Sequence, residues 1–446
     1  MTVTKPIPAA PDVLIDVPAW RLLRSARDPM AAIDAIGRET NGALARLHLG
    51  PARPYLVTHP AHVEHVYRNA DRYRREGMLW KPVRRLVGTG IAGEGERWRT
   101  SRRILQPLFT LRHTRSMSDA MAAAVGEAVE LLARRVADGR PVDVLTEMTR
   151  ITHRVLIRVF FGNRIREDDA DRLSTAIDAA FVALGWRIAL PWVGHAMPVP
   201  GDRAFAKAVR IADEVIYPLI RTARPDDDDL VAHLVAARDE HGEPLEEARI
   251  RDDLVGMVVA GTEVTALTLT WVWVLLDAHP EVFARLSEEA AAVVGGGDPR
   301  PEHLPRLEQT RMVLRETLRL YPVGWVLPRL LTADDTLGGV PIRAGSTIML
   351  SPYLTHRLPG VWPDPLTFDP QRFAGQELPR FGYLPFSAGP HSCLGEHFGH
   401  AQAQLAVAAV LARFRPELVG PRSLRPRATA SLRPWHRARM VLRPRG

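Results

Sequence analysis

Cysteine is nearly absent from this sequence, because its 446 residues include only one, Cys393. A lone thiol cannot form an internal disulfide, and it cannot supply a metal cage or an iron–sulfur cluster that needs several cysteines. Three roles remain for it: a packed core residue, a nucleophile or a single metal ligand. The scarcity of cysteine also agrees with a reducing, cytoplasmic location.

The sequence also lacks an N-terminal apolar run, so we expect neither a signal peptide nor a membrane anchor. One stretch, from Leu254 to Leu276, is long enough to span a bilayer, but it contains Gly256, Gly261 and Glu263. A glutamate in the middle of a span is costly in lipid, and this cost favours a buried central helix.

Repeats, low-complexity tracts and obvious linkers are absent too, so we expect a single domain over residues 1–446. The net charge is +8, and basic residues concentrate at 97–115 and near the C-terminus. No aromatic-studded basic module is visible, so we do not expect nucleic-acid binding. The basic side chains form either a solvated face or a docking surface for an acidic protein.

Helical periodicity dominates what is present, and strand signals are short. The helices that we expect cover residues 30–40, 61–69, 97–109, 117–137, 142–161, 168–184, 203–222, 230–240, 252–278, 281–294, 307–320 and 398–411. The strands that we expect cover 45–49, 54–57, 347–350, 429–432 and 438–442, with the last two as a hairpin or edge pair around Pro434. The expected fold class is therefore mainly α with small β-sheets.

The surroundings of Cys393 favour a metal ligand over the other two roles. Gly389 and Gly395 lie on either side of it, where the backbone can approach a bound group closely. An apolar helical run follows, so the thiolate would lie near a helix N-terminus, which stabilises negative charge. A low thiol pKa and a flat approach surface suit an axial haem ligand.

The spacing Phe386-x-x-Gly389-x-His391-x-Cys393-x-Gly395 resembles the haem-binding signature of the cytochrome P-450 family. The resemblance extends from about Pro18 to the C-terminus. It implies the family's fold, with haem b held between a long central helix and the cysteine-bearing loop. It also implies that Cys393 is the metal ligand, a proximal thiolate that pushes electron density onto the iron.

Other interpretations of the cysteine region stay open at this point. Cys393 could be a packed cysteine in a glycine-rich turn. A zinc site could combine His391, Cys393, His397 and His400, although zinc gives no reason for Phe386 or for the flanking glycines. A basic helical protein without catalysis, associated with a membrane or nucleic acid, is the remaining class.

A second motif, Glu316-x-x-Arg319, lies near the end of an expected helix. Residues at this spacing share a helix face, so a surface ion pair would be its ordinary explanation. The resemblance pairs both residues with Arg372 from a later loop, in a buried structural network. Gln371 stands where the family usually has glutamate. Such a network is expensive to desolvate and indicates geometry more than stability.

A third motif, Trp98-x-x-x-Arg102, places an indole N–H and a guanidinium on one helix face, where together they can bind a haem propionate. A half-buried tryptophan at a helix end is the simpler explanation of this motif taken alone. The resemblance adds Arg329 and His391 as further donors to the propionates.

The fourth motif, Ala-Gly-Thr-Glu-Val-Thr at residues 260–265, resembles the family's oxygen-activating segment. It implies that Ala260 and Gly261 let haem and dioxygen approach the helix. It also implies that Glu263 relays protons, beside Val264 and Thr265 in the catalytic segment.

Val264 departs from the family pattern, which has an alcohol at this position. A valine cannot donate a hydrogen bond to dioxygen or hold a water there. Thr265 or Thr262 could substitute through a shifted helix turn, or a substrate hydroxyl could supply the donor. Alternatively, the enzyme couples poorly or runs an oxidation that depends less on proton delivery.

The resemblance implies a monooxygenase that inserts one oxygen atom from dioxygen into an apolar substrate. Electrons would come from NAD(P)H through a separate ferredoxin and reductase, because the sequence shows no flavin motif. An acidic ferredoxin would dock near residues 97–115, and we expect a monomer. A haem-thiolate peroxygenase, or a rearrangement or coupling enzyme, is the alternative within the haem class because of Val264.

The segments that would line the substrate pocket are apolar, which favours a bulky terpene-like compound or another secondary metabolite. The candidate lining residues are Met78, Trp80, Phe181, Trp186, Val259, Val264, Val323, Trp325 and Val326.

Overall fold

The structure is a computed structural model that describes residues 7, 9–24, 28–50, 52–189, 197, 199–224, 227, 229–375, 377–420 and 424–445. The chain forms two compact units. The sheet unit comprises the described residues of Met1–Gly77, Met312–Cys393 and Ser423–His436. The helical unit comprises those of Met78–Arg311, Leu394–Arg422 and Arg437–Gly446.

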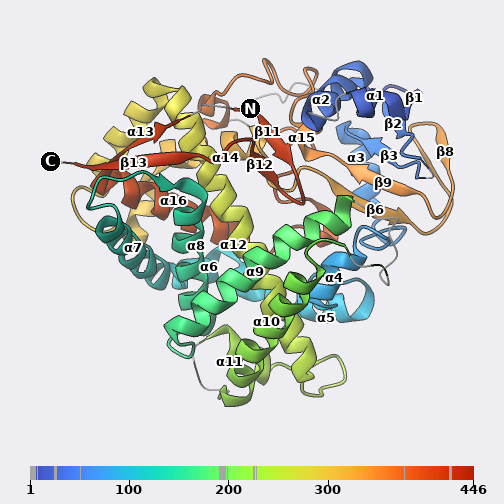
Figure 1. The fold of residues 1–446 in the computed structure, drawn as a ribbon. Helices are drawn as coiled ribbons and strands as arrows, with labels where there is room; N and C mark the ends of the chain where they lie inside the picture. Colours follow the sequence, from blue (N-terminus) through green and yellow to red (C-terminus); the bar gives the residue numbers. More distant parts are fainter. Residues whose placement is uncertain are drawn as a thin grey trace. The chain divides into compact units, whose positions relative to one another are not determined.

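A six-stranded sheet with strand order β1-β2-β3-β9-β6-β4 organises the sheet unit (Figure 1). Its β1–β2 and β3–β9 pairs are parallel, and the other neighbouring pairs are antiparallel. Val57, Val63 and Leu350 belong to one buried cluster that joins these strands to α3 (Pro60–Arg68). The strands are β1 (Leu14–Val17), β2 (Leu44–Leu47), β3 (Tyr55–Val57), β4 (Tyr73–Arg74), β6 (Leu327–Leu331) and β9 (Thr347–Leu350).

The rest of the sheet unit consists of short elements, except for α2 (Pro29–Thr40) and α14 (Glu308–Leu320), which belongs to this unit from Met312 on. Two small antiparallel pairs, β7–β8 and β11–β12, lie outside the main sheet. The short elements are α1 (Ala19–Arg24), β7 (Asp335–Leu337), β8 (Val340–Ile342), α15 (Pro352–Thr355), η3 (Pro370–Phe373), η4 (Gly389–His391), β11 (Pro426–Ala428) and β12 (Leu432–Pro434).

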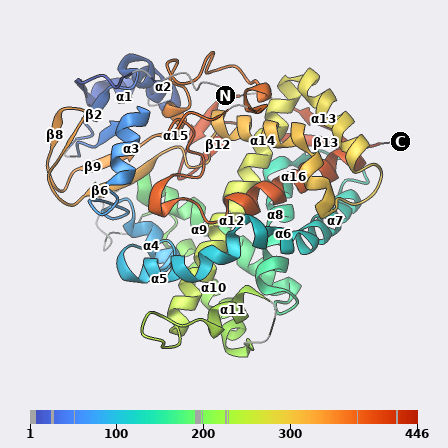
Figure 2. The same cartoon turned by 180° about the vertical axis from the view of Figure 1, so that it is seen from behind.

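The helical unit is built around α12 (Glu247–Ala278), which packs against α4, α8, α10 and α16. Figure 2 shows α16 beside α12 and α8 from behind. The other helices are α4 (Lys81–Val87), α5 (Gly95–Leu105), η1 (Gln106–Phe109), α6 (Leu111–Ser116), α7 (Ser118–Arg135), α8 (Val144–Phe161), α9 (Glu167–Ala189), α10 (Asp202–Thr222), α11 (Leu230–Ala236), α13 (Pro280–Val293), η2 (Pro301–Arg306) and α16 (Glu396–Arg413). A small sheet joins β10 (Phe414–Val419), β13 (Arg439–Pro444) and β5 (Val142–Asp143).

α12 is long and apolar enough to cross a membrane, but 83% of its most apolar window is buried inside the protein. Leu267, Leu269 and Trp271 have no exposed surface. A helix that is apolar on all sides and covered by protein is a core helix. The expectation of a buried central helix is confirmed.

The C-terminal strands differ from the expected hairpin. β12 pairs with β11, whereas β13 pairs with β10 and β5. The Thr429 hydroxyl donates to the Ser431 carbonyl oxygen at 2.6 Å, so the expected strand at 429–432 is mostly a tight turn. The hairpin prediction was wrong because each strand found its partner elsewhere in the chain, and local alternation carries no information on such pairing.

The helix expected at 230–240 ends early, at Ala236. Ala237 is extended, and Arg238 forms an isolated bridge with Pro244. The Asp239 carboxylate accepts hydrogen bonds from the N–H groups of His241 and Glu243, at 2.8 and 2.9 Å. A side chain that binds nearby backbone N–H groups competes with the helix, and here it forms a turn instead.

Candidate functional site

The loop that carries Cys393 is held by its own backbone. The Cys393 N–H donates to the Phe386 carbonyl oxygen at 2.9 Å, and the Ser392 N–H donates to the Gly389 carbonyl oxygen at 3.0 Å. Ser387 and Gly389 have left-handed conformations, with φ of 62° and 67°. A left-handed serine costs free energy, so contacts around the loop must maintain it.

Tyr67, from α3, provides such contacts. Its hydroxyl oxygen lies 2.8 Å from the Ser387 Oγ, and a Cβ added to Gly389 would lie 3.3 Å from the Tyr67 Cβ. Burial raises the pKa of the Tyr67 phenol, which therefore stays neutral. The buried guanidinium of Arg329, from β6, lies 5.9 Å from the centre of the same ring. One tyrosine thus contacts both the cysteine loop and a predicted propionate donor.

Cys393 itself is exposed. A cysteine that only packed a glycine-rich turn would be expected to be buried, as most unreactive structural cysteines are. The residues of the loop fit a haem, because one exposed thiol can supply an axial thiolate. The missing side chain of Gly389 lets the loop pack closely against Tyr67. His391, the other predicted donor on this loop, is half-buried in η4.

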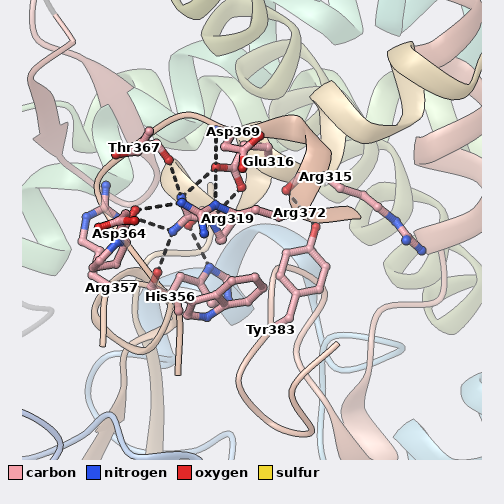
Figure 3. A network of polar contacts seen from close by, with 12 residues as sticks. Arg315, Glu316, Arg319, His356, Arg357, Asp364, Thr367, Asp369, Arg372 and Tyr383 are labelled. Carbon is pink, nitrogen blue, oxygen red and sulfur yellow. Dashed lines mark hydrogen bonds and ion pairs between the residues drawn. The ribbon is translucent and has the colours of Figure 1, made fainter. Parts of the chain in front are cut away.

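Glu316, Arg319 and Arg372 come together in the sheet unit (Figure 3). Arg319 donates from Nε and Nη2 to the Glu316 carboxylate at 2.6 and 2.8 Å, and both side chains have no exposed surface. The Arg372 Nε lies 3.5 Å from Glu316 Oε1. A guanidinium has five N–H donors, so three remain on Arg319. These three bind the carbonyl oxygens of His356, Pro365 and Thr367.

His356 belongs to this network, although the sequence analysis did not find it. In Figure 3 Glu316 lies above Arg319 and His356 lies below it. The Leu384 N–H donates to His356 Nε2 at 2.7 Å, and His356 Nδ1 lies 2.9 Å from the Arg319 carbonyl oxygen. Burial lowers the pKa of His356 to about 3. Its two partners lie 37 and 28 residues away in the chain, so no local pattern could indicate this role.

The middle of α12 has a few accessible positions among buried ones. Ala260 is exposed and Val264 is half-buried, one turn apart on the same face. The neighbouring Val259, Glu263 and Thr265 are buried. Ala260 and Val264 have short apolar side chains, which suit a flat group lying against the helix.

Gly261 also lies at a close contact between two helices, and its expected role beside haem stays a prediction. A Cβ at this position would come within 2.9 Å of a Leu156 methyl carbon on α8. The absence of a side chain therefore allows α8 and α12 to pack closely.

The threonines near Val264 do not take its place by a shifted turn, because α12 is one uninterrupted α-helix. The Thr262 hydroxyl donates to the Val258 carbonyl oxygen at 2.8 Å within the helix. Thr265 faces α16, since its Oγ1 would lie 3.8 Å from a Cβ added to Gly399. The face that carries Val264 has no hydroxyl from either threonine.

Trp98 and Arg102 lie one turn apart on α5, and both are half-buried. The Arg102 Nε donates to the Gln106 Oε1 at 2.9 Å, so part of its guanidinium is already oriented. The spacing places both side chains on one helix face, as expected.

The candidate pocket residues have varied surroundings. Val259 and Val323 are buried, Met78 is 49% exposed, and Trp80 and Val326 are half-buried. The indole N–H of Trp325 donates to the Thr429 carbonyl oxygen at 3.0 Å, so the ring is anchored to the turn before β12. The side chains of Phe181 and Trp186 lie outside the described part of the structure.

The zinc alternative is not supported. Within the described part of the chain, the group whose ligand atoms lie close enough for a three-ligand metal site is Glu96, Glu240 and His241, all exposed. The four residues His391, Cys393, His397 and His400 do not form such a group.

The comparison with known families decides between the remaining interpretations. Residues 20–434 match the sequence profile of the cytochrome P-450 family. This chain belongs to the cytochrome P-450 family. It is therefore an oxidoreductase that incorporates oxygen and depends on haem. The matched residues include most of both compact units. The expectation of a single domain over residues 1–446 stays a prediction.

Three relatives of the cytochrome P-450 family align with this chain over most of their own length. Pentalenene oxygenase of Streptomyces avermitilis is 31% identical over 95% of this chain and 94% of its own. Cyclooctat-9-en-7-ol 5-monooxygenase of Streptomyces melanosporofaciens is 35% identical over 84% and 83%. Cyclooctatin synthase of the same organism is 32% identical over 93% and 91%.

Proposed function

We propose that this chain is a haem b monooxygenase that oxidises a terpene-like or similarly bulky apolar metabolite, with Cys393 as the proximal ligand. The observation that carries the proposal is the exposed thiol of Cys393 on a braced loop, in a chain of the cytochrome P-450 family with no other cysteine. The substrate class is supported by two relatives, whose names refer to pentalenene and to cyclooctat-9-en-7-ol.

The chain's own residues would hold the cofactor from several elements. Cys393 supplies the thiolate, and Ala260 with Val264 offers an apolar surface on α12. When bound, haem supplies the dioxygen chemistry, in which one oxygen atom enters the substrate and the other leaves as water. The candidate donors to its propionates are Trp98, Arg102, Arg329 and His391.

Proton delivery would rest on Glu263 and on the substrate. Glu263 is buried on α12 and can hold a proton, whereas Val264 can neither donate a hydrogen bond nor anchor a water. A substrate that carries its own hydroxyl would supply the missing donor. The name cyclooctat-9-en-7-ol, of a relative's substrate, denotes such an alcohol.

The monooxygenase activity is tested with labelled dioxygen, NADPH, a ferredoxin and its reductase, and a panel of cyclic terpenes and terpene alcohols. We expect a product with one labelled oxygen atom and faster turnover of the alcohols. Products without label, or no terpene product at all, would contradict the proposal.

Val264→Thr tests the proton-delivery hypothesis, because threonine has nearly the shape of valine and adds a hydroxyl. We expect more product per NAD(P)H consumed with substrates that lack a hydroxyl. Val264→Ala is the matched control, since it changes the side chain without adding a donor. An unchanged yield in Val264→Thr would show that proton delivery is not limited at this position.

Val264 also favours a second candidate, a peroxygenase or a rearrangement or coupling enzyme of the haem-thiolate type. A peroxygenase needs no separate delivery of electrons, because peroxide brings both the oxygen and the oxidising equivalents. Labelled hydrogen peroxide without reductase separates the candidates. Efficient transfer of label from peroxide would favour the peroxygenase, and its absence would favour the monooxygenase.

The proposed electron donor is an acidic ferredoxin, reduced by its own reductase, that binds a monomer of this chain in the cytoplasm. Arg103, Arg112 and Arg115 are exposed in the basic segment 97–115. Because opposite charges speed encounter, Arg115→Glu should slow reduction by ferredoxin most strongly at low ionic strength, with the haem content unchanged. A reduction rate equal to that of the wild type would exclude this docking surface.

A further inference from the structure

The His356 ring joins two parts of the sheet unit through its two nitrogens. The Leu384 N–H group can only donate, so His356 Nε2 accepts at 2.7 Å and carries no proton. His356 Nδ1 must then carry the ring proton, and it donates to the Arg319 carbonyl oxygen at 2.9 Å. Both bonds therefore require the neutral ring in one tautomer.

One end of this link is rigid. The Arg319 side chain uses all five of its donors, and one of them binds the carbonyl oxygen of His356 itself at 2.9 Å. Arg319 and His356 thus bind each other twice, once through each residue's side chain. The His356 ring also stacks on Tyr383, with ring centroids 5.4 Å apart and planes at 27° (Figure 3).

The other end of the link leads to the cysteine loop. The Leu384 carbonyl oxygen accepts from the Ser387 N–H at 3.1 Å, and the Phe386 carbonyl oxygen accepts from the Cys393 N–H at 2.9 Å. Ser387 is the left-handed residue whose side chain contacts Tyr67. Hydrogen bonds, joined by the backbone of residues 384–387, therefore connect Arg319 to the backbone of Cys393.

We propose that His356 is a positioning residue for Cys393, and that its neutral ring holds the start of the cysteine loop through the Leu384 N–H. The inference rests on the proposed function, since it requires Cys393 to be the haem ligand. Protonation of His356 would turn the acceptor Nε2 into a second donor facing the Leu384 N–H, and the loop would lose this anchor.

The charged groups around the ring oppose its protonation. Arg319 on α14 and Arg357, next in the chain, are both cationic, and the acid of the cluster, Glu316, is already bound to Arg319. The Tyr383 phenol, whose ring stacks on His356, donates to the Arg315 carbonyl oxygen at 3.0 Å. Full burial is the largest cause that lowers the pKa of His356 to about 3, and the two cations add to it.

Two variants test the roles of the two ring nitrogens separately. In His356→Asn the short amide can still donate to the Arg319 carbonyl oxygen, but its oxygen does not reach the Leu384 N–H. In His356→Gln the longer amide places an oxygen near the position of Nε2. His241→Asn is the matched surface control, because the His241 side chain is 72% exposed.

The main measurement is the difference spectrum of the reduced, carbon monoxide-bound haem protein from about pH 8 to about pH 5. We expect the red-shifted, thiolate-ligated band of the wild type to weaken on acidification, because a displaced His356 takes up a proton that the anchored ring, with its pKa of about 3, does not. The ratio of protein whose cysteine loop has left its position to protein with the thiolate bound should rise up to tenfold per pH unit as the pH falls below about 6.5. His356→Asn should lose much of the band already at pH 8, whereas His356→Gln should keep it and lose the steep pH dependence.

Hydrogen exchange of the Leu384 amide in the same haem-loaded samples gives a second measurement that does not depend on haem absorption. We expect faster exchange in His356→Asn and wild-type protection in His356→Gln. Equal spectra and equal exchange in all variants would overturn the inference. An equal loss of the band and of amide protection in His356→Asn and His356→Gln would overturn it as well. A wild type with no red-shifted band at pH 8 would instead contradict the proposed function, in which Cys393 is the haem ligand.

Discussion

Single residues of the cysteine loop determine its shape because several backbone positions are strained or crowded. Gly389 has a φ of 67° and rests against Tyr67, and Ser387 is held at a φ of 62° by contact with the Tyr67 hydroxyl. The local spacing around Cys393 was enough to predict this loop from the sequence. Tyr67 and His356 were not predictable, because they contact the loop or its start from distant positions in the chain.

Gly389→Ala should destabilise the protein by about 1–3 kcal/mol, because alanine is strained at this φ and its Cβ would press on Tyr67. Urea denaturation measures the change. Gly296→Ala is the control, because a Cβ there meets nothing within 4 Å, and we expect it to change stability by less than about 0.5 kcal/mol. Equal stability of the two variants would contradict the strain argument.

At the scale of elements, α14 connects to the segments that follow it through one arginine. Arg319 binds Glu316 on its own helix and three carbonyl oxygens between His356 and Thr367. A buried ion pair gives little net stability, but the loss of one partner leaves a buried charge without compensation. The contact therefore acts mainly by holding these segments in one arrangement.

Arg319→Ala should lower the free energy of unfolding by roughly 3–5 kcal/mol, because it leaves the Glu316 carboxylate buried without its main partner. Arg68→Ala is the control, since the Arg68–Glu64 pair is 2.7 Å long but the arginine side chain is 64% exposed. We expect it to cost under about 1 kcal/mol. The account would be wrong if denaturant midpoints moved equally in both.

The long helices were predictable, whereas several short strands, such as β1, β6 and β10, were not expected. The strand at 347–350 and the helices that became α2, α10 and α13 were expected within a residue or two of their ends. The expected 429–442 hairpin was wrong, because β12 and β13 pair with other strands. The periodicity of side chains identifies an element, whereas its partner depends on packing that spans the whole chain.

For the whole molecule, the mainly α fold with small sheets and the membership of the cytochrome P-450 family are confirmed. The haem-binding and catalytic residues stay predictions, because contacts within each unit do not show which groups touch a cofactor. Buried titratable side chains in both units, however, make the stability of the fold depend on pH.

Acid should destabilise the protein through three buried histidines. The pKa values of His62, His153 and His356 fall from 6.5 to about 4, 4 and 3 on folding, mainly through burial. The unfolded chain therefore takes up protons that the folded protein does not, and stability is lost as the pH falls from about 6.5 towards these values. Asp253 acts in the opposite direction, because burial raises its pKa from 3.8 to about 6.

Three histidines against one aspartate give a net loss of stability on the order of 2 kcal/mol per pH unit near pH 5. Urea denaturation at several pH values between about 7.5 and 5 measures this slope. His241→Asn, on the surface, should leave the slope unchanged. A midpoint that stays constant or rises on acidification would contradict the assigned protonation states.

The most direct test of the account is the difference spectrum of the reduced, carbon monoxide-bound protein, recorded for the wild type and for Cys393→Ser at equal haem content. The account predicts a Soret band shifted to the red by thiolate ligation in the wild type and the loss of this shift in Cys393→Ser. A wild type that binds no haem, or a shifted band that persists without the Cys393 thiol, would contradict the assignment of the proximal ligand.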